Sequence, residues 1–199
     1  MSCMKSKGWR LGGVLVLGVF ALTISVLAFT FTAIDVPGAT ATQADGINER
    51  GEIVGLYDAG GATHGFVLDQ GVFTAINVPG APMTTVWDIN DRGQIVGFYN
   101  AAGLVHGFLL DPGGAFTYPI DVPGATTTRI FRINASGEIV GGYQTGLVAH
   151  GFLRDKKGAF TAINVPGGTQ TQAFGINARG KIVGGYIAGG VAHGVVVDP

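Results

Sequence analysis

Residues 31–72 read FTAIDVPGATATQADGINERGEIVGLYDAGGATHGFVLDQGV, and the same pattern begins again at Phe73, Phe116 and Phe160. These starting points lie 42, 43 and 44 residues apart. Every copy carries Phe-Thr, Val-Pro-Gly, Ile-Asn, Ile-Val-Gly, a tyrosine and a His-Gly pair. Self-similarity at a fixed period of this size indicates a repeat architecture, in which each copy folds as one supersecondary unit.

Each copy divides into four short segments that have the composition of β-strands, named here A to D. Examples are Thr84–Asn90 (A, TTVWDIN), Gln94–Tyr99 (B, QIVGFY), Val105–Asp111 (C, VHGFLLD) and Phe31–Val36 (D, FTAIDV). Asx residues and glycine stand between the strands, as in Asn90–Gly93, and predict tight turns. No helical periodicity follows residue 30, so we predict an all-β fold.

The predicted strands carry apolar side chains on both faces. In Ile95–Tyr99, for example, neither alternate set of residues is polar. Sheets that are buried on both faces suit the blades of a β-propeller, which pack against one another. We therefore predict a four-bladed β-propeller in which each repeat of roughly 43 residues forms one blade and strand A lines the central channel.

The two ends of the repeat array predict how the ring closes. The array starts with a D strand at Phe31–Val36 and finishes with a C strand at His193–Asp198, so the last blade lacks its own D strand. Phe31–Val36 can supply it by pairing with the C-terminal blade, which would remove the open edges. Pro119, in the third D strand, fits an outermost strand. We predict a closed monomer, and the alternative is an array that closes only by oligomerising.

The first 28 residues differ from the repeats. Lys5, Lys7 and Arg10 precede an uncharged apolar run from Leu11 to Phe29. This is the pattern of a secretory signal peptide, with a cleavage site after Ala28. The run is also long enough for an uncleaved membrane anchor. We predict a targeting segment at residues 1–28 and a propeller domain at 29–199, exported to the periplasm, the cell surface or the medium.

Composition excludes several classes of function. The net charge is −1 and only 13% of residues are charged, with no basic stripe. Nucleic-acid binding is therefore not expected. Cys3 is the only cysteine, so the repeats contain neither a disulfide framework nor thiol chemistry.

The repeat resembles the HAF family of bacterial extracellular proteins, whose copies pair an I-N-x-x-G-x-I/V-V-G segment with a downstream His-Ala-Phe. In this chain the second element reads His-Gly-Phe in three copies and His193-Gly194-Val195 in the last copy. The resemblance covers Phe31 to the end. It implies an extracellular, propeller-like protein and transfers neither a catalytic residue nor a ligand.

Residues common to all four repeats are interpreted as structural. We expect the histidines to hydrogen-bond within their blades, because buried polar groups normally find partners. We expect the asparagines to form the A–B turns, the Asx residues before Val-Pro-Gly to cap the D–A loop, and the tyrosines to pack between blades. The histidines are His64, His106, His150 and His193; the asparagines are Asn48, Asn90, Asn134 and Asn177; the loop residues are Asp35, Asn77, Asp121 and Asn164; the tyrosines are Tyr57, Tyr99, Tyr143 and Tyr186.

Residues that differ between repeats are the candidates for function. They stand just before Ile-Asn on strand A, where the fourfold pattern breaks near the predicted axis. Carboxylates, an arginine and aromatic rings in one place could hold a polar ligand. The alternative is that the rings fill the core and the charges line a small wet channel. The candidate ligand-binding residues are Asp45, Trp87, Asp88, Phe131 and Arg132.

These patterns predict a non-catalytic exported protein that acts as a binding or structural surface module for a glycan or another surface protein. The alternative is a carbohydrate-active enzyme, a hydrolase or a lyase, that uses Asp45, Asp88 and Arg132 at the channel mouth. The sequence contains no Ser/His/Asp order, no glycine-rich phosphate loop and no metal-ligand spacing. We therefore assign no catalytic residue, no metal and no cofactor.

Overall fold

A computed structural model of the chain describes residues 29–198. Within the described part, the residues from Ala33 onward form one compact unit. The targeting segment predicted for residues 1–28 lies outside the described residues. Within the described part, no helix has the length and hydrophobicity needed to cross a bilayer.

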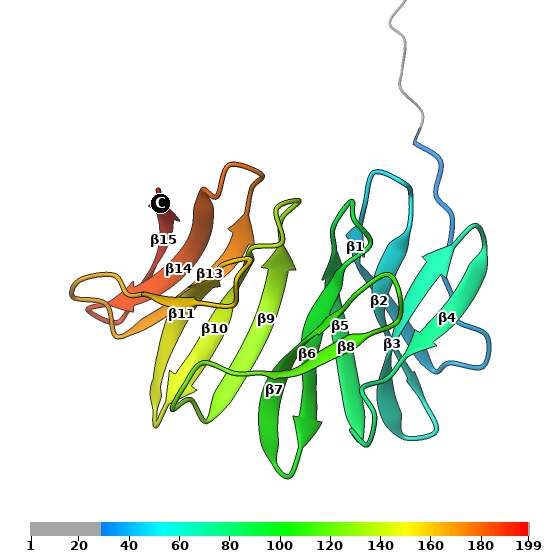
Figure 1. The fold of residues 1–199 in the computed structure, drawn as a ribbon, viewed down its shortest axis with the longest axis horizontal. Helices are drawn as coiled ribbons and strands as arrows, with labels where there is room; N and C mark the ends of the chain where they lie inside the picture. The colour runs from blue at the N-terminus through cyan, green and yellow to red at the C-terminus, as the bar shows by residue number, and fades with distance from the viewer. Residues whose placement is uncertain (1–28, 199) are drawn as a thin grey trace, which may run out of the picture. The chain divides into compact units, whose positions relative to one another are not determined.

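The described residues fold entirely into strands, turns and loops, which confirms the all-β prediction (Figure 1). The strands between residues 41 and 197 are β1 Ala41–Ile47, β2 Ile53–Ala59, β3 Ala62–Asp69, β4 Val72–Ile76, β5 Met83–Ile89, β6 Ile95–Ala101, β7 Leu104–Leu110, β8 Phe116–Ile120, β9 Thr127–Ile133, β10 Ile139–Thr145, β11 Val148–Arg154, β12 Phe160–Ile163, β13 Gln170–Ile176, β14 Ile182–Ala188 and β15 Val191–Val197.

Each repeat forms a small antiparallel sheet with the predicted order A-B-C-D. Blade 1 is β1-β2-β3-β4, blade 2 is β5 to β8, blade 3 is β9 to β12, and blade 4 is β13 to β15. Strands β8 and β12 pair only with the C strand of their own blade, so D is the outer strand. Single parallel bridges, Val105 to Thr127 and Ala149 to Gln170, link blade 2 to blade 3 and blade 3 to blade 4.

Neighbouring blades are held together by apolar contacts between strand B of one blade and strand A of the next. Val54 of blade 1 belongs to the same buried cluster as Val86 and Ile89 of blade 2. Val96 of blade 2 is buried with Ile130 of blade 3 in the same way. The A strands of successive blades also contact one another, and they form the inner rim of the row of blades.

The D–A loop is fastened differently from the prediction. A threonine hydroxyl on strand A accepts a hydrogen bond from the valine amide of Val-Pro-Gly, as in Val78 N to Thr84 Oγ1 at 3.0 Å. The Asx residue before this valine turns instead to the histidine of its own blade, as in Asn77 Oδ1 to His64 Nδ1 at 2.7 Å. Thr can cap the loop because it follows six residues later, where the chain has turned back.

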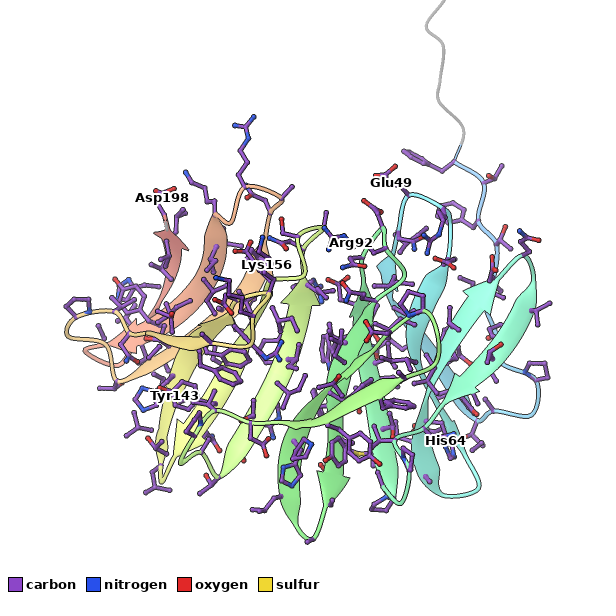
Figure 2. The ribbon with its side chains drawn as sticks, in the orientation of Figure 1. Glu49, His64, Arg92, Tyr143, Lys156 and Asp198 are labelled. Atoms are coloured by element: carbon purple, nitrogen blue, oxygen red, sulfur yellow. The ribbon has the colours of Figure 1, made fainter. Side chains whose placement is uncertain are left out.

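The A–B and C–D turns lie at one end of the blades. Glu49 and Arg92, from A–B turns, and Lys156, from a C–D turn, are labelled along the upper edge in Figure 2, whereas His64 and Tyr143 lie lower down. Charged residues are thus concentrated at the end that carries the A–B and C–D turns. The end that carries the B–C and D–A loops consists largely of small residues and histidine–tyrosine pairs.

The predicted pairing between Phe31–Val36 and the C-terminal strand is wrong for this structure. Residues 31–36 form no strand, β15 pairs only with β14, and the sheets do not close into a ring. The turn from Val36 to Ala39 is not the reason, because equivalent turns precede β5 and β9, whose D strands do pair; the reason is the separation of the two ends of the row. Blade 1 and blade 4 lie at opposite ends of the row in Figure 1, with two blades between them.

Candidate functional site

The varying position on strand A is a β-bulge in every blade. The pairing between strands A and B skips Asp45, Trp87, Phe131 and Phe174 in turn. A bulge leaves one residue out of the ladder and redirects its side chain. The one position at which the repeats differ most is therefore also the position that the backbone sets apart from the ladder.

Three of these bulge residues join Phe98 of β6 in a continuous line of rings, the aromatic row. The centroid of Trp87 lies 6.3 Å from that of Phe98 and 5.7 Å from that of Phe131. Phe131 lies 5.7 Å from Phe174. These spacings lie within the range of favourable aromatic contacts. The aromatic row thus runs along the inner rim across blades 2, 3 and 4.

Glycines make room for the row in blades 3 and 4. Gly142 and Gly185 occupy the repeat position of Phe98. A Cβ at Gly142 would stand 3.6 Å from the Phe131 ring, and one at Gly185 would stand 3.4 Å from the Phe174 ring. Phe174 remains 49% exposed, so the row ends in a ring that is open to solvent.

Polar side chains border the row. The guanidinium carbon of Arg129 lies 5.7 Å from the centroid of Phe98, a cation–π arrangement. Arg129, Gln144 and Gln172 line a small recess with Phe131 between blades 3 and 4. The side chain of Trp87 also carries a buried Nε1 donor that has no partner among the described residues. The row therefore offers flat apolar faces next to hydrogen-bond donors.

Asp88 links blade 2 to blade 3 at the inner rim. Its Oδ2 accepts a hydrogen bond from the backbone amide of Ile133 at 3.0 Å. Burial raises the pKa of Asp88, and the hydrogen bond from Ile133 and the positive charge of Arg132 oppose this rise. Gly46 of blade 1 packs closely against Asp88, because a Cβ there would stand 3.0 Å from the Asp88 Cα and 3.1 Å from Oδ1. Asp88 is thus a carboxyl group that holds its proton more tightly than an exposed one.

The other two predicted ligand-binding residues have local partners. Arg132 donates from Nη1 to the carbonyl oxygen of Phe131 at 2.8 Å. Asp45 accepts a hydrogen bond at Oδ1 from Gln43 on the same strand at 2.6 Å, and it lines a shallow pocket with Ile34. Trp87, Asp88, Phe131 and Arg132 therefore lie together in blades 2 and 3, whereas Asp45 sits on blade 1.

Sequence reasoning compared Phe174 with its counterparts but did not select it, and it missed Phe98 and Arg129. A signal for them was present, because the repeats also differ at their positions. The position of Phe98 reads Leu, Phe, Gly and Gly, and that of Arg129 reads Gln, Thr, Arg and Gln. Comparing every aligned position, instead of the two before Ile-Asn, would have included both.

The histidines make contacts within their blades. His64, His106 and His150 each hydrogen-bond through Nδ1 to the Asx residue of the following D strand, at 2.7 to 2.8 Å. Each imidazole also lies against the tyrosine opposite it on strand B, with centroids 4.9 to 5.3 Å apart. Within residues 29–198, no three His, Cys, Asp or Glu side chains come close enough to hold a metal ion.

The repeat asparagines form turns and also connect the blades. Asn90 Oδ1 accepts hydrogen bonds from the amides of Arg92 and Gln94 inside its own turn. Its Nδ2 donates to the carbonyl oxygen of Asn134 in the next blade at 3.1 Å. Asn48 and Asn134 make the equivalent bond to the following blade, at 3.2 and 3.1 Å. This Asn ladder was not predicted from the turns alone.

Similar solved structures are those of lyases. "Streptogramin B lyase structure" shares 18% identity with a TM-score of 0.46, covering 79% of this chain and 55% of that one. A catalytically inactive variant of virginiamycin B lyase from Staphylococcus aureus, solved with quinupristin, shares 16% identity with a TM-score of 0.42, covering 77% and 55%. The chain thus spans about half the length of these lyases. No family model and no curated protein sequence matches the chain.

This comparison corrects the function expected from sequence. The expected non-catalytic surface module for a glycan or a protein is contradicted, because the similar solved structures are those of lyases, which are enzymes. At these identities no residue role passes from the lyases to this chain. Any function for the chain must be argued from its own inner rim.

Proposed function

We propose that this chain is a four-bladed propeller-type enzyme domain whose aromatic row binds a substrate that carries a planar ring beside carbonyl or carboxylate groups. The observation that carries the proposal is the line of four rings from Phe98 to Phe174, bordered by Arg129 and two glutamines. Flat rings are bound by stacking, and a guanidinium next to them can hold a carbonyl or carboxylate oxygen.

Asp88 is the group that we propose moves a proton in this enzyme. It follows Trp87 directly, it is largely buried, and burial raises its pKa above the ordinary value. A carboxyl group with a raised pKa is a better proton acceptor than an exposed carboxylate, and it can return the proton near neutral pH.

Binding and turnover test the two parts of this proposal separately. Trp87 is the only tryptophan after residue 28, so its fluorescence reports on ligands at the row. Quinupristin and simple aromatic amides are the first probes. We expect Phe131→Ala, which keeps the Trp87 reporter, to weaken binding roughly tenfold, the effect of losing about 1.4 kcal/mol of ring contact. Asp88→Asn should bind the same probe and lose its turnover.

Two results would contradict the proposal. If no planar probe quenches Trp87 fluorescence at millimolar concentration, the aromatic row is a packing feature and not a substrate site. If a probe binds and is turned over equally well by Asp88→Asn, then Asp88 has only the structural role of accepting the hydrogen bond from Ile133.

We also propose that residues 1–28 direct the chain out of the cytoplasm. The positive residues followed by an uncharged apolar run support this proposal. Fractionation of producing cells, followed by N-terminal sequencing, tests it. A start at Phe29 in the exported fraction would identify a cleaved signal peptide, an intact start in the membrane fraction an anchor, and an intact cytoplasmic chain would contradict export.

A further inference from the structure

The two end blades present faces that are buried everywhere else in the row. Each of the first three blades covers strand A of the next blade with its B and C strands, and among the described residues no strand lies against the equivalent face of blade 4. Val54, Val96 and Val140 are fully buried at this contact, whereas the equivalent Val183 of blade 4 is 48% exposed. We call this surface of blade 4, with Val183 and Gly194, the open B/C face.

Blade 1 presents the complementary surface. Ile89 of blade 2 and Ile133 of blade 3 are 4% and 5% exposed because the preceding blade covers them, whereas the equivalent Ile47 is 66% exposed. Ala44 holds the position of Val86 on the same strand. We call this surface, with Ala44 and Ile47, the open A face.

The C-strand glycines show that the open B/C face has the shape of an interface. Gly65, Gly107 and Gly151 are each covered by a residue of the following blade, namely Val86, Ile130 and Ala173, and a Cβ at any of them would be crowded. Gly194 has the same place in blade 4 and nothing lies within 4 Å of its Cβ position. Val86, Ile130 and Ala173 occupy one position of the repeat, and the residue at this position in blade 1 is Ala44. The repeat pattern therefore predicts that Ala44 of a following blade 1 would cover Gly194.

The hydrogen-bond patterns end at the same two places. The Asn ladder runs from Asn48 to Asn177, and among the described residues no fourth bond continues it from Asn177. Three histidines hold an Asx residue of a D strand, but no such bond is present for His193. Asp35 occupies the same repeat position as these Asx residues, and no histidine of the described part bonds to it. Both missing partners would come from the N-terminal side of a blade 1.

A groove beside β15 marks the place of a missing D strand. It has a volume of about 720 Å³ and is lined mostly by apolar residues, among them Ile163, Ile182, Val195 and Val197. In blade 1 the D-strand residue Ile76 is buried opposite Gly65. The repeat pattern places Ile34 opposite Gly194 and Ala33 opposite Val195 in the same register.

We propose that the open B/C face binds the N-terminal segment and the open A face of a second copy of this chain. Residues 33–36 of the second copy would add a fourth strand to blade 4, with Asp35 on His193 and Ile34 in the groove. If the open B/C face of each chain binds the open A face of the other, two chains form a closed head-to-tail dimer. Adding a strand to an open edge supplies backbone hydrogen bonds that β15 otherwise lacks.

A second copy fits better than the chain's own N-terminal segment. Within one chain, the D segment of blade 1 would have to reach across the whole row to pair with β15. Blades 2 and 3 stand between this segment and β15 (Figure 1). The interface is continuous with the three blade contacts already formed inside the chain. It uses neither the aromatic row nor Asp88 and does not depend on the proposed enzyme activity.

The mass of the purified protein in solution tests the proposal. We expect twice the chain mass at micromolar concentration, and at least a tenfold weaker association for Val183→Glu, which places a charge on the open B/C face. Val72→Glu is the matched control, because Val72 is also exposed, at 64%, but lies on β4 outside the contact. A folded wild-type monomer at all concentrations would overturn the proposal.

Cross-linking identifies the strand that docks. In a Cys3→Ser background, chains carrying only Ala33→Cys are mixed with chains carrying only Val195→Cys. Opposite residues on paired strands bring their Cβ atoms to about 4.5–5.5 Å, close enough to disulfide-bond after a small adjustment. We expect disulfide-linked dimers from the mixture. Cross-links that form only within one chain, when both cysteines are on the same molecule, would show that the chain closes on itself and would overturn the proposal.

Discussion

Blade 2 and blade 4 are built from the same repeat, yet only blade 2 is completed by its neighbours. Phe108 of blade 2 is fully buried and contacts the D-strand ring of Phe116, whereas blade 4 has Val195 at this position and no D strand. Val96 is buried and Val183 is half exposed. The difference shows that much of the repeat motif specifies contacts between blades, so that one repeat alone cannot bury its own apolar surface.

Truncating a core side chain should give the largest difference in unfolding free energy between blade 2 and blade 4. Phe108→Ala removes a fully buried ring and is expected to lower the free energy of unfolding by about 3–5 kcal/mol. Val195→Ala, at the same repeat position in blade 4, should cost under about 1.5 kcal/mol because Val195 is only half buried. Urea denaturation followed by circular dichroism measures both. Equal losses would show that blade 4 is packed as tightly as blade 2.

The Asn ladder gives a comparison of intermediate size. Asn90→Ala removes three hydrogen bonds within its turn and the bond to blade 3, and Asn177→Ala removes two turn bonds. We expect Asn90→Ala to cost roughly 1 kcal/mol more than Asn177→Ala, the usual worth of one hydrogen bond whose partner is left buried. Thermal unfolding of the two variants tests this. A larger loss for Asn177→Ala would mean that the ladder contributes nothing between blades.

Two carboxyl groups should give opposite pH effects of smaller size. Burial raises the pKa of Asp88, so the folded state holds its proton more tightly than the unfolded state, and stability falls as pH rises from the ordinary aspartate pKa of 3.8. The Asn48 side chain lowers the pKa of Glu52, so stability falls as pH drops through the glutamate range below 4.5.

Midpoints of thermal unfolding between pH 3 and pH 7 measure these effects. Asp88→Asn should remove the loss above pH 3.8, and Glu52→Gln should remove the loss at low pH. If Asp88→Asn leaves the pH profile unchanged, the carboxyl group is hydrated and its raised pKa, together with its proposed role, is wrong.

The blade pattern could be predicted from the sequence because it is repeated. Four copies of Val-Pro-Gly and Ile-Asn fix where strands end, and Pro119 alone indicates that strand D lies outside. The function of the Asx residue before Val-Pro-Gly could not be predicted, because its histidine partner lies 13 to 15 residues earlier in the chain and only the pairing of strands C and D brings the two together.

The aromatic row was predicted in part. Trp87 and Phe131 stand out as departures from the repeat, but the bulge that redirects them is a backbone feature with no residue signature of its own, since Asp, Trp and Phe all occupy it. The closed ring was predicted from the number of strands. Counting strands says nothing about the angle between blades, and that angle decides whether the first and last blades of one chain meet.

Amide hydrogen exchange at β15 tests most directly whether the repeat faces of the end blades are completed by a second chain. The account predicts that the amides of Gly194–Val197 exchange slowly in the wild-type protein and rapidly in Val183→Glu, while those of β7 exchange equally slowly in both, because β7 is enclosed by its own neighbours. Exchange at β15 that is the same in the two proteins would contradict the account.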